Sequence, residues 1–426
     1  MAMVLLLVVF FVLLLISVPV FVALGGASLA YTHFIGNLPD FVVLHRMVGG
    51  VDSFPLIAVP FFILAGNLMN SAGITNRIFD FATAAVGWLK GGLGHVNVIA
   101  SVIFAGMSGA AVADAGGLGT IEVKAMRDRG YNDHLAVGVT AASSTIGPII
   151  PPSLPMVIFG VMANVSIGQL FAAGFIPGLL MAASLMLYIT WYSWRHKIGA
   201  DQAFRLRVLA TSFINAVPAL LTPAIIIGGI ATGAFTPTEA AIAACAWALI
   251  LGFVVYRTLS VKRFYQISIQ TIETTASVLV IVAAASLFGW VLTLTQVTAQ
   301  FTALLLTITD DPIMLLLIIN VIILIVGCFM ETIAAISILV PILMPAVLHV
   351  GIDPVQFGVV MVLNLMIGLI TPPIGMVLFV LARVSNLSIE KTVKATAPFL
   401  IPLFAVLMLI TVFSDLTLWL PTLWYR

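Results

Sequence analysis

Charged residues are scarce in this sequence. Only 8% of its 426 residues are Asp, Glu, Lys or Arg, whereas 62% are hydrophobic. Soluble domains carry about 25% charged residues, so this composition excludes a soluble globular protein and indicates a chain that crosses a membrane many times. The net charge of +1 and the lack of any long basic run argue against a nucleic-acid-binding role.

Cysteine is equally scarce, and the common catalytic motifs are missing. Cys245 and Cys328 both lie in apolar stretches, and two cysteines cannot build a disulfide or metal framework, so we expect them to be packing residues. The chain has no phosphate-binding G-x-x-x-x-G-K-[ST] loop, and therefore does not itself hydrolyse ATP. It also lacks the H-E-x-x-H and G-x-S-x-G motifs of metalloproteases and hydrolases. We expect a protein that is not an enzyme and needs no organic cofactor.

Long hydrophobic runs make up most of the chain. A membrane crossing needs roughly 20 apolar residues. Residues 1–24 are apolar from the start and lack the positive region of a signal peptide, which predicts a retained first membrane helix. Further apolar segments fall at about 54–70, 134–163, 170–192, 213–232, 238–256, 273–294, 356–384 and 397–415.

Two other apolar stretches, at about 93–126 and 313–348, are too long and irregular for one crossing. Small or polar residues lie at the middle of each, over residues 105–110 in the first and 329–334 in the second. Irregular backbone inside a membrane is tolerated only against protein or water. We therefore predict two helical hairpins that enter the membrane and turn back.

The most informative feature is a proline interruption that occurs twice. Residues 146–152 read I-G-P-I-I-P-P and return, 221 positions later, as I-G-L-I-T-P-P over residues 367–373. Proline cannot donate to the carbonyl four residues back, so Pro151 is expected to free the carbonyl of Gly147, and the second copy that of Gly368. Two interrupted helices in corresponding places of two halves indicate the binding site of a transporter.

The repeat extends well beyond the interruptions. Shorter matches at shifts of 221 to 223 positions pair residues 64–66 with 287–289, 97–99 with 320–322 and 130–132 with 351–353. Residues 56–177 and 279–400 are therefore predicted to be two copies of one unit, each with a scaffold helix, an arm, a hairpin and a broken helix. Residues 1–55, 178–278 and 401–426 would supply an N-terminal scaffold helix and connection, further scaffold helices and a C-terminal helix.

The distribution of Lys and Arg predicts that the two copies have opposite orientations in the membrane. The loop after the first hairpin carries Lys124, Arg127 and Arg129, whereas its counterpart over residues 349–354 has no Lys or Arg. Cytoplasmic loops are enriched in these residues, so the two loops are expected on opposite sides. All of Lys and Arg except Arg46 and Arg426 then fall on the cytoplasmic side. Inverted repeats of this kind are a structural basis for alternating access.

The interruptions also predict the chemistry of the site. Carbonyl groups at the end of a half-helix suit a small cation such as Na+, and free amides at the start of the next suit an anionic substrate. The alternative is a pair of proline kinks packed by neighbouring helices. The candidate cation ligands are the carbonyls of Gly147, Ile150, Gly368 and Thr371 and the hydroxyls of Ser108, Thr332 and Thr371.

A few side chains are candidates for contact with the substrate or its ion. Asp114 lies within the first hairpin and Glu331 near the tip of the second, and ionisable residues at membrane depth are usually functional. A structural ion pair is the alternative for both. Gly109 is a tip residue of the first hairpin, and Arg383 either faces a carboxylate or is an ordinary interfacial arginine, which we favour. Residues 236–239 read T-P-T-E and predict a helix-capping box.

Taken together, the two interruptions, the A-G-M-S-G sequence of residues 105–109 and G-A-F-T-P-T-E-A-A over residues 233–241 resemble the large membrane subunit of TRAP (tripartite ATP-independent periplasmic) transporters. The resemblance covers essentially the whole chain. It implies an all-α, multi-pass protein of the bacterial inner membrane with an elevator-type fold of the ion transporter superfamily. It also implies two partners: a small Q-type membrane subunit, here expected on a separate polypeptide, and a periplasmic substrate-binding protein.

The resemblance further implies uptake of an organic acid together with Na+, with sialic acid favoured on overall similarity and C4-dicarboxylates next. Carried over by position, the sodium sites would use Ser108, Gly147, Ile150 and Pro152 in the first copy, and Thr332, Gly368 and Thr371 in the second. Leu369 and Met376 stand where the first copy has Pro148 and Pro155, so the two sites are expected to differ in shape. A stand-alone Na+/dicarboxylate symporter, an anion channel and a membrane scaffold without transport remain the alternatives.

Overall fold

Within the described residues 2–16, 18–36 and 38–425, the computed structural model contains helices and one isolated bridge between Lys90 and Ala200. The side chains of residues 2–5, 15, 40, 107 and 108 lie outside the description. In chain order the helices are α1 (Ala2–Leu15), α2 (Val20–Phe34), α3 (Asp40–Val51), the 3-10 turn η1 (Phe54–Ile57), α4 (Ala58–Ser71), α5 (Ile74–Val86), α6 (Gly92–Ser108), α7 (Ala111–Gly116), α8 (Leu118–Asp128), α9 (Asp133–Ser144), α10 (Leu154–Ala163), α11 (Ile167–Arg195), α12 (Leu206–Ala231), α13 (Pro237–Ile250), the π-helical turn η2 (Leu251–Val255), α14 (Val261–Leu294), α15 (Val297–Leu306), α16 (Pro312–Phe329), α17 (Thr332–His349), α18 (Pro354–Gly368), α19 (Met376–Ser385), α20 (Ile389–Val412) and α21 (Asp415–Trp424).

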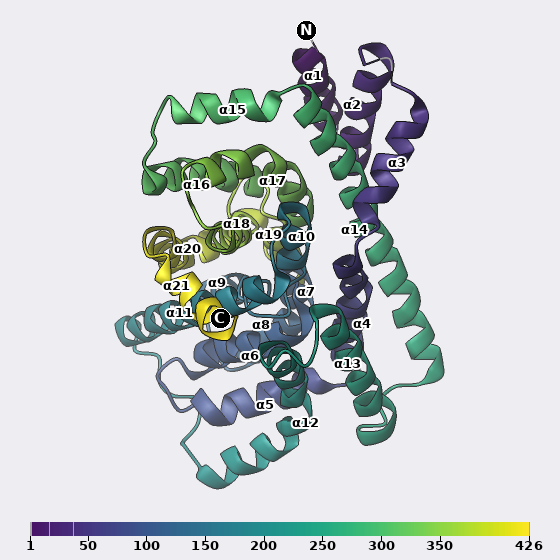
Figure 1. Cartoon of the computed structure of the whole chain (residues 1–426). Coiled ribbons are helices and arrows are strands. Elements are labelled where there is room, and N and C mark those ends of the chain that lie inside the picture. Colours follow the sequence, from purple (N-terminus) through teal and green to yellow (C-terminus); the bar gives the residue numbers. More distant parts are fainter. Residues whose placement is uncertain (1, 17, 37, 426) are drawn as a thin grey trace.

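The helices confirm an all-α membrane protein. Eight helical segments in the described part of the chain are long and apolar enough to cross a membrane, among them α11, α12, α14 and α20. The 34-residue α14 packs against α2, α3 and α4, and Figure 1 shows this group along one side of the molecule. A helix of this length spans about 51 Å, well beyond the ~30 Å hydrocarbon core, so α14 extends outside the core or lies tilted within it.

The prediction of one membrane helix over residues 1–24 is wrong. Helix α1 ends at Leu15, and α2 begins at Val20 and packs back against α1. Pro19 is the reason, because proline offers no N–H to a preceding turn and keeps the residue before it out of the helical region. The described part of the predicted N-terminal segment 1–55 therefore holds three α-helices, where one had been expected.

Both predicted hairpins are confirmed as helix–turn–helix units. We define hairpin 1 as α6, α7 and α8, and hairpin 2 as α16 and α17. Hairpin 1 turns at Gly109, whose φ of +61° lies in the left-handed region that glycine adopts without strain. The returning arm of hairpin 1 is interrupted at Gly117, whereas that of hairpin 2 stays helical through Pro341 and Pro345.

The two predicted helix interruptions are confirmed as well. We call residues 145–153, between α9 and α10, break 1, and residues 369–375, between α18 and α19, break 2. In both, the proline pair lies in the non-helical segment, where a helix would lack a donor and meet a steric clash. The broken helices lie at the centre of the molecule in Figure 1, with α5 and α6 toward the bottom and α15 and α16 toward the top.

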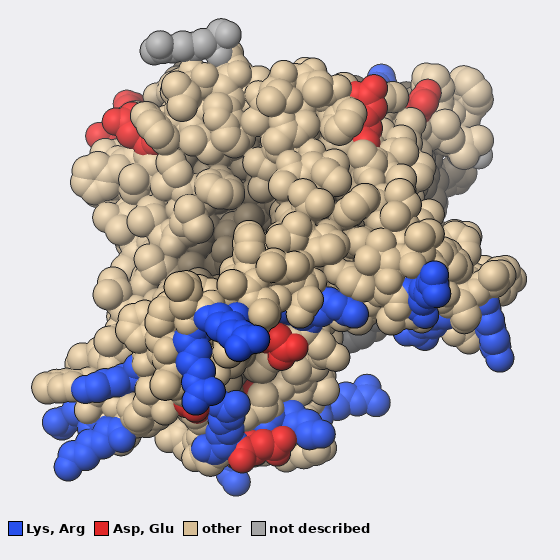
Figure 2. Space-filling view, turned by 90° about the horizontal axis from the view of Figure 1, so that it is seen from below, with Lys and Arg blue, Asp and Glu red and all other residues tan. Residues whose placement is uncertain are grey.

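Charged residues lie at two edges of the molecule. Figure 2 shows Lys and Arg gathered along the lower edge of one face, mostly Asp and Glu along the upper edge, and an uncharged band between them. This pattern is what a membrane protein with a basic cytoplasmic side presents. It agrees with the side predicted from the loops.

The predicted capping box is confirmed at the start of α13. The Thr236 hydroxyl accepts the N–H of Glu239, and the Glu239 carboxylate in turn accepts the backbone N–H of Thr236 at 2.8 Å. Pro237 occupies the first helical position, where a missing N–H costs nothing. The helix-capping role that the sequence predicts for Thr236 and Glu239 is therefore the role that they have in the fold.

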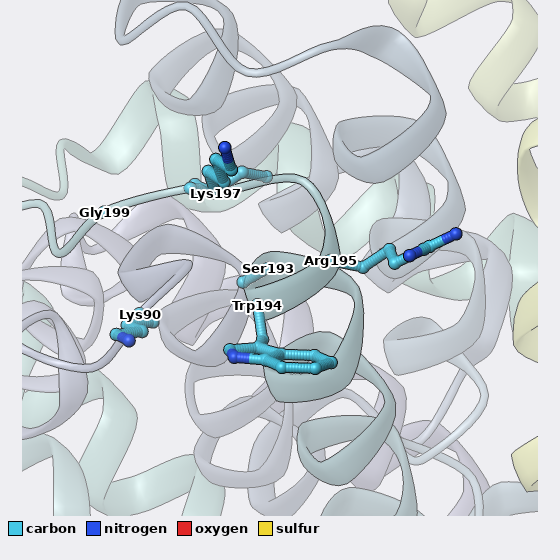
Figure 3. A pocket seen from close by; sticks show the side chains of 7 residues that line it. Lys90, Ser193, Trp194, Arg195, Lys197 and Gly199 are labelled. Carbon is cyan, nitrogen blue, oxygen red and sulfur yellow. The ribbon is translucent and has the colours of Figure 1, made fainter.

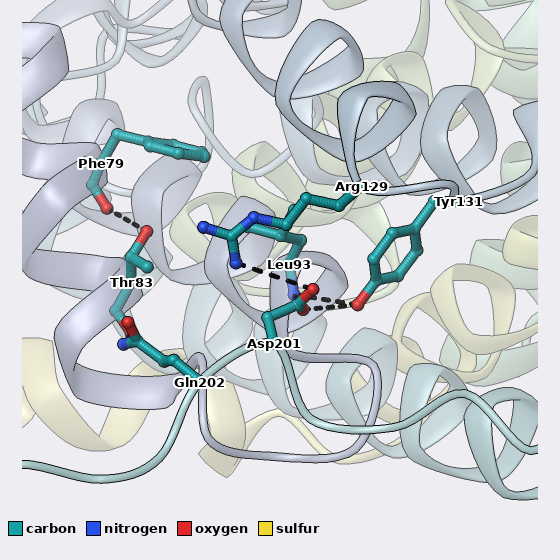
Figure 4. Close-up of polar contacts among 7 residues, drawn as sticks. All are labelled: Phe79, Thr83, Leu93, Arg129, Tyr131, Asp201 and Gln202. Carbon is teal, nitrogen blue, oxygen red and sulfur yellow. Dashed lines mark hydrogen bonds and ion pairs between the residues drawn. The ribbon is translucent and has the colours of Figure 1, made fainter.

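The linker of residues 196–205, between α11 and α12, is fastened to hairpin 1 and to α5 (Figure 4). The Asp201 carboxylate accepts the Tyr131 hydroxyl at 2.5 Å and the Leu93 N–H at 2.7 Å, and Arg129 lies 3.7 Å away. The Gln202 amide donates to the carbonyl of Thr83 at 2.5 Å. Burial and the bond to Asp201 raise the pKa of Tyr131, so its phenol remains a donor to higher pH than an ordinary tyrosine does.

Candidate transport site

Ser153 stabilises the non-helical conformation of break 1 through two hydrogen bonds of its hydroxyl group. Ser153 begins α10: its hydroxyl accepts the N–H of Met156 at 3.2 Å and donates to the carbonyl of Pro148. The carbonyl of Ile146 accepts the N–H groups of Ile149 and Ile150. The chain thus makes its own bonds on both sides of the interruption and leaves the Gly147 and Pro152 carbonyls as candidate ligands.

The tip of hairpin 1 closes over break 1. A Cβ on Gly109 would come within 2.6 Å of the Pro152 carbonyl oxygen, so the tip and the second proline are in direct contact. Asp114, in the first turn of α7, is 2% exposed. A Cβ on Gly147 would overlap the Asp114 carboxylate. The structure therefore gathers Gly109, Asp114, Gly147 and Pro152 at one place.

Break 2 is closed by local bonds. The carbonyl of Gly368, expected to be free, accepts the N–H of Thr371 at 3.0 Å, which corrects that prediction. The turn supplies this donor in place of the one that Pro372 lacks, and only the second lone pair of the carbonyl remains for a ligand. The Thr371 hydroxyl donates to the carbonyl of Ile367 at 2.7 Å and keeps its own lone pairs available.

Hairpin 2 contacts break 2 through its backbone. The N–H of Gly375 donates to the carbonyl of Cys328 at 3.2 Å, and a Cβ on Gly368 would lie 2.6 Å from the Gly327 carbonyl carbon. Thr332 begins the returning arm, is 2% exposed, and its hydroxyl has no hydrogen-bond partner among the described residues. A buried hydroxyl without a partner is costly, so Thr332 is the strongest candidate ligand in the second copy.

Each hairpin is also tied to its own broken helix by a buried asparagine. In hairpin 1, the Asn97 amide donates to Thr140 at 2.7 Å and accepts the Ser143 hydroxyl at 2.6 Å. In hairpin 2, Asn320 accepts the amide of Asn364 at 2.9 Å. The two asparagines occupy equivalent positions of the repeat, so the same connection is present in both copies.

Glu331, Arg383 and Ser108 are the remaining residues that the sequence suggested for the site. Glu331 caps α17: its carboxylate accepts the N–H groups of Ile333 and Ala334 at 2.8 and 3.1 Å, which gives it a structural role. Arg383 is exposed in the last turn of α19, as an interfacial arginine would be. Ser108 ends α6 beside Gly109, but its side chain lies outside the described residues, and its role in sodium binding stays a prediction.

A cavity of about 220 Å³ lies beside the tip of hairpin 1. One wall comes from hairpin 1 and break 1, including Gly109, Ala110 and Pro152. The opposite wall comes from α4 and α14, with the polar side chains Asn67, Asn70, Gln270 and Thr274. Its lining therefore offers backbone groups, amides and a hydroxyl, and the residues that form it carry no formal charge.

The amino-acid sequence of the chain matches a known family. The sequence profile described as "Tripartite ATP-independent periplasmic transporter, DctM component" matches residues 7–416. The chain belongs to this TRAP transporter family. The membrane-protein character expected from the composition is thereby confirmed at the level of the family.

Several TRAP permeases are similar along most of their length. The sialic acid TRAP transporter large permease protein SiaM of Vibrio cholerae is 48% identical over 411 residues, which cover 96% of each chain. The C4-dicarboxylate TRAP transporter large permease protein DctM of Pseudomonas aeruginosa is 37% identical over 370 residues, 87% of each chain. The isethionate TRAP transporter permease protein DctMQ of Oleidesulfovibrio alaskensis is 42% identical over 406 residues, which cover 94% of this chain but 64% of that relative.

A solved structure shares the fold of this TRAP permease. The YdaH transporter of Alcanivorax borkumensis superposes with a TM-score of 0.65 over 96% of this chain and 98% of its own, at 14% identity. At that identity the likeness shows the fold alone.

Some buried polar residues of this TRAP permease near the candidate site were missed in the sequence. Glu122 is 1% exposed, one of its carboxylate oxygens has no hydrogen-bond partner among the described residues, and it lies close enough to Asp114 for their charges to repel. A bound cation or proton would relieve this repulsion. Glu122 stands beside the basic loop in the sequence, and no motif there marks it as a site residue. Asn97 and Asn320 belong to the sequence repeat, but the repeat does not predict which side chains they bind.

Proposed function

We propose that this TRAP permease is the transporting subunit of a Na+-coupled importer that takes up an organic acid by an elevator mechanism. The observation that carries the proposal is the duplicated meeting of a hairpin tip with a broken helix, at Gly109 and Pro152 in one copy and at Cys328 and Gly375 in the other. Half-helix ends at the middle of a transporter are where ions and substrates bind in such folds.

Two sodium sites follow from this geometry. The first would combine the Gly147, Ile150 and Pro152 carbonyls with the Ser108 hydroxyl, and the buried Asp114 carboxylate beside Gly147 supplies the negative charge that favours a cation. The second would combine Gly368, Thr371 and Thr332. The unpartnered Thr332 hydroxyl supports it, because a bound ion would supply the contact that the hydroxyl lacks.

The proposal assigns the substrate to the cavity beside hairpin 1. Its amide-rich lining suits the hydroxyl and carbonyl groups of an organic acid, and backbone amides and a bound Na+ suit the carboxylate. Sialic acid is favoured because the 48% identical relative carries that name, and a C4-dicarboxylate is second. Gly109 lines the cavity, but Glu331 and Arg383 do not, so the proposal gives the latter two no contact with the substrate.

The proposal includes two partners and a location. A small Q-type membrane subunit, on a separate polypeptide, and a periplasmic substrate-binding protein would complete the transporter in a bacterial inner membrane. The fused name of the isethionate relative, DctMQ, shows that separation is not universal among the relatives, so copurification with a separately expressed small subunit is the direct check.

The test is uptake by proteoliposomes that contain both membrane subunits, with loaded binding protein added outside. We expect accumulation of labelled sialic acid that requires an inward Na+ gradient. Robust uptake without Na+ and without a proton gradient would refute the coupling. Uptake by this chain alone would favour a self-sufficient symporter, and single-channel currents without Na+ coupling would favour an anion channel.

A double variant tests the sites themselves. Ser108→Ala combined with Thr371→Ala removes one proposed hydroxyl ligand from each sodium site. We expect loss of Na+-driven uptake with normal membrane insertion. Unchanged uptake would indicate that the breaks are packed kinks and that the chain serves as a scaffold.

A further inference from the structure

A cavity of about 530 Å³ lies at the end of α11, far along the chain from both breaks (Figure 3). Lys90, in the turn before α6, and Lys197, in the turn after α11, line this cavity, and Arg195 at the end of α11 lies at its edge with its side chain extended away from both lysines. Trp194 forms part of its wall. The lining residues thus include three cations and an aromatic ring, and no carboxylate.

The three cations are not neutralised by the protein. Among the described residues, ion pairs join Arg127 with Asp133, Arg129 with Asp201 and Lys394 with Glu390, and none involves the cations of this cavity. The acid closest to them in the chain, Asp201, is engaged by Tyr131, Leu93 and Arg129 (Figure 4). The cavity therefore has an unbalanced positive charge that suits an anion.

A buried serine lies in the same wall, beside Gly91. Ser193 lines the cavity, is 0% exposed, and its hydroxyl has no hydrogen-bond partner among the described residues. The hydroxyl packs against Gly91, where an added Cβ would overlap it, so the protein encloses this group. The cations of the lining are therefore the groups that an anionic phosphate would meet.

The position of the cavity favours a lipid as the source of that phosphate. Helix α11 has 29 residues and is about 43 Å long, so its end passes beyond the ~30 Å hydrocarbon core into the head-group region. Leu187, Trp191 and Trp194 are each more than half exposed near this end. Exposed Trp at the level of the head groups, above an apolar surface, is a typical lipid-facing arrangement.

We propose that this cavity binds the phosphate-bearing head group of an anionic phospholipid in the cytoplasmic leaflet, with the acyl chains lying along Leu187 and Trp191. Basic pockets on the cytoplasmic side of membrane proteins bind such head groups. The site joins the end of α11 to the start of hairpin 1, because Lys90 precedes α6 and Gly91 donates its N–H to the carbonyl of Gly199. A bound lipid therefore holds these two elements together.

The test measures phosphatidylglycerol binding to the purified protein by native mass spectrometry, with phosphatidylcholine and inorganic phosphate as parallel ligands. The variant carries Lys90→Gln, Arg195→Gln and Lys197→Gln. Each cation near a membrane surface contributes about fivefold in affinity, so we expect phosphatidylglycerol to bind the variant on the order of a hundredfold more weakly. Phosphatidylcholine and inorganic phosphate are expected to bind wild type weakly.

A matched control removes the same charge elsewhere on the basic side, by Arg207→Gln, Lys262→Gln and Lys391→Gln, three exposed residues outside the cavity. We expect the control to bind phosphatidylglycerol as wild type does. Equal losses in both triple variants, or no loss in the first, would overturn the proposal. Binding of inorganic phosphate without phosphatidylglycerol would make the cavity a site for free anions and would also refute the lipid assignment.

Discussion

Replacing Thr332 by valine tests whether this residue binds an ion or only packs in the protein core, because the two roles predict different responses to Na+. The hydroxyl is buried and has no partner among the described residues. Leaving such a group unsatisfied costs roughly 1–3 kcal/mol, and valine removes the group while keeping the shape of the side chain. Without Na+, Thr332→Val is therefore expected to be more stable than wild type by up to about that amount.

With Na+ present, an ion ligand behaves differently. A ligand that binds only the folded state adds stability that grows with its concentration, and a tenfold loss of affinity removes about 1.4 kcal/mol of this gain at saturation. Thr332→Val is thus expected to lose much of the Na+-dependent stabilisation, and Na+-driven uptake is expected to need more Na+. The assay is thermal unfolding in detergent over a Na+ titration, with K+ keeping the ionic strength constant.

Ser337→Ala is the matched control. Ser337 lies on the same helix, is 0% exposed, and has a hydroxyl without a partner among the described residues. We expect it to gain stability without Na+ and to keep the wild-type response to Na+. A full Na+ response in Thr332→Val, or the same loss in both variants, would refute the assignment of Thr332 as a ligand.

Three other changes have defined outcomes. Gly147→Ala would push a methyl group against the buried Asp114 carboxylate, and we expect it to cost roughly 1–3 kcal/mol of stability and to abolish uptake. Gly228→Ala is the control, because the space around Gly228 is open and we expect no effect. Expression, thermal unfolding and uptake measure both variants. Tyr131→Phe removes the hydrogen bond to Asp201 and is expected to lower stability by about 1–2 kcal/mol at neutral pH. Because the pKa of Tyr131 is raised by folding, wild type alone should lose that contribution as the pH rises above the ordinary value of about 10; a parallel pH profile in the variant would contradict this. Thr236→Ala removes the cap of α13 and is expected to cost about 1 kcal/mol in thermal unfolding, with Thr236→Ser as the control that retains it.

Much of the fold was predictable because its decisive features are local. Proline cannot remain in a regular helix without losing a bond, so the breaks before Leu154 and Met376 were visible in the sequence, as was their repetition. Small residues at the middle of a long apolar stretch likewise predicted the tip at Gly109. The split at Pro19 follows from the same rule, and it was overlooked because the surrounding residues are uniformly apolar.

The site was less predictable because its contacts join distant segments. No sequence rule places Asn67 and Gln270 on the wall opposite Gly109, since these positions meet only in the folded chain. Glu331 was read as an ionisable group at depth, yet its neighbours' amides make it a helix cap. The Gly368 carbonyl was expected to be free because proline removes its helical donor. The turn supplies another donor, the N–H of Thr371, and the proline rule alone does not predict this bond.

The paired asparagines restrict how the molecule can rearrange. Asn97 binds α6 to α9, and Asn320 binds α16 to α18, in both cases through amides shut away from water. Separating either pair would strand buried polar groups at roughly 1–3 kcal/mol each, while the wall formed by α4 and α14 is not joined to the hairpins by these asparagines. These bonds therefore favour displacements that keep each hairpin together with its broken helix. Each proposed ion site would then move as one unit, because its hairpin and its broken helix stay together. Only the proposed substrate cavity, which has α4 and α14 as its other wall, would open.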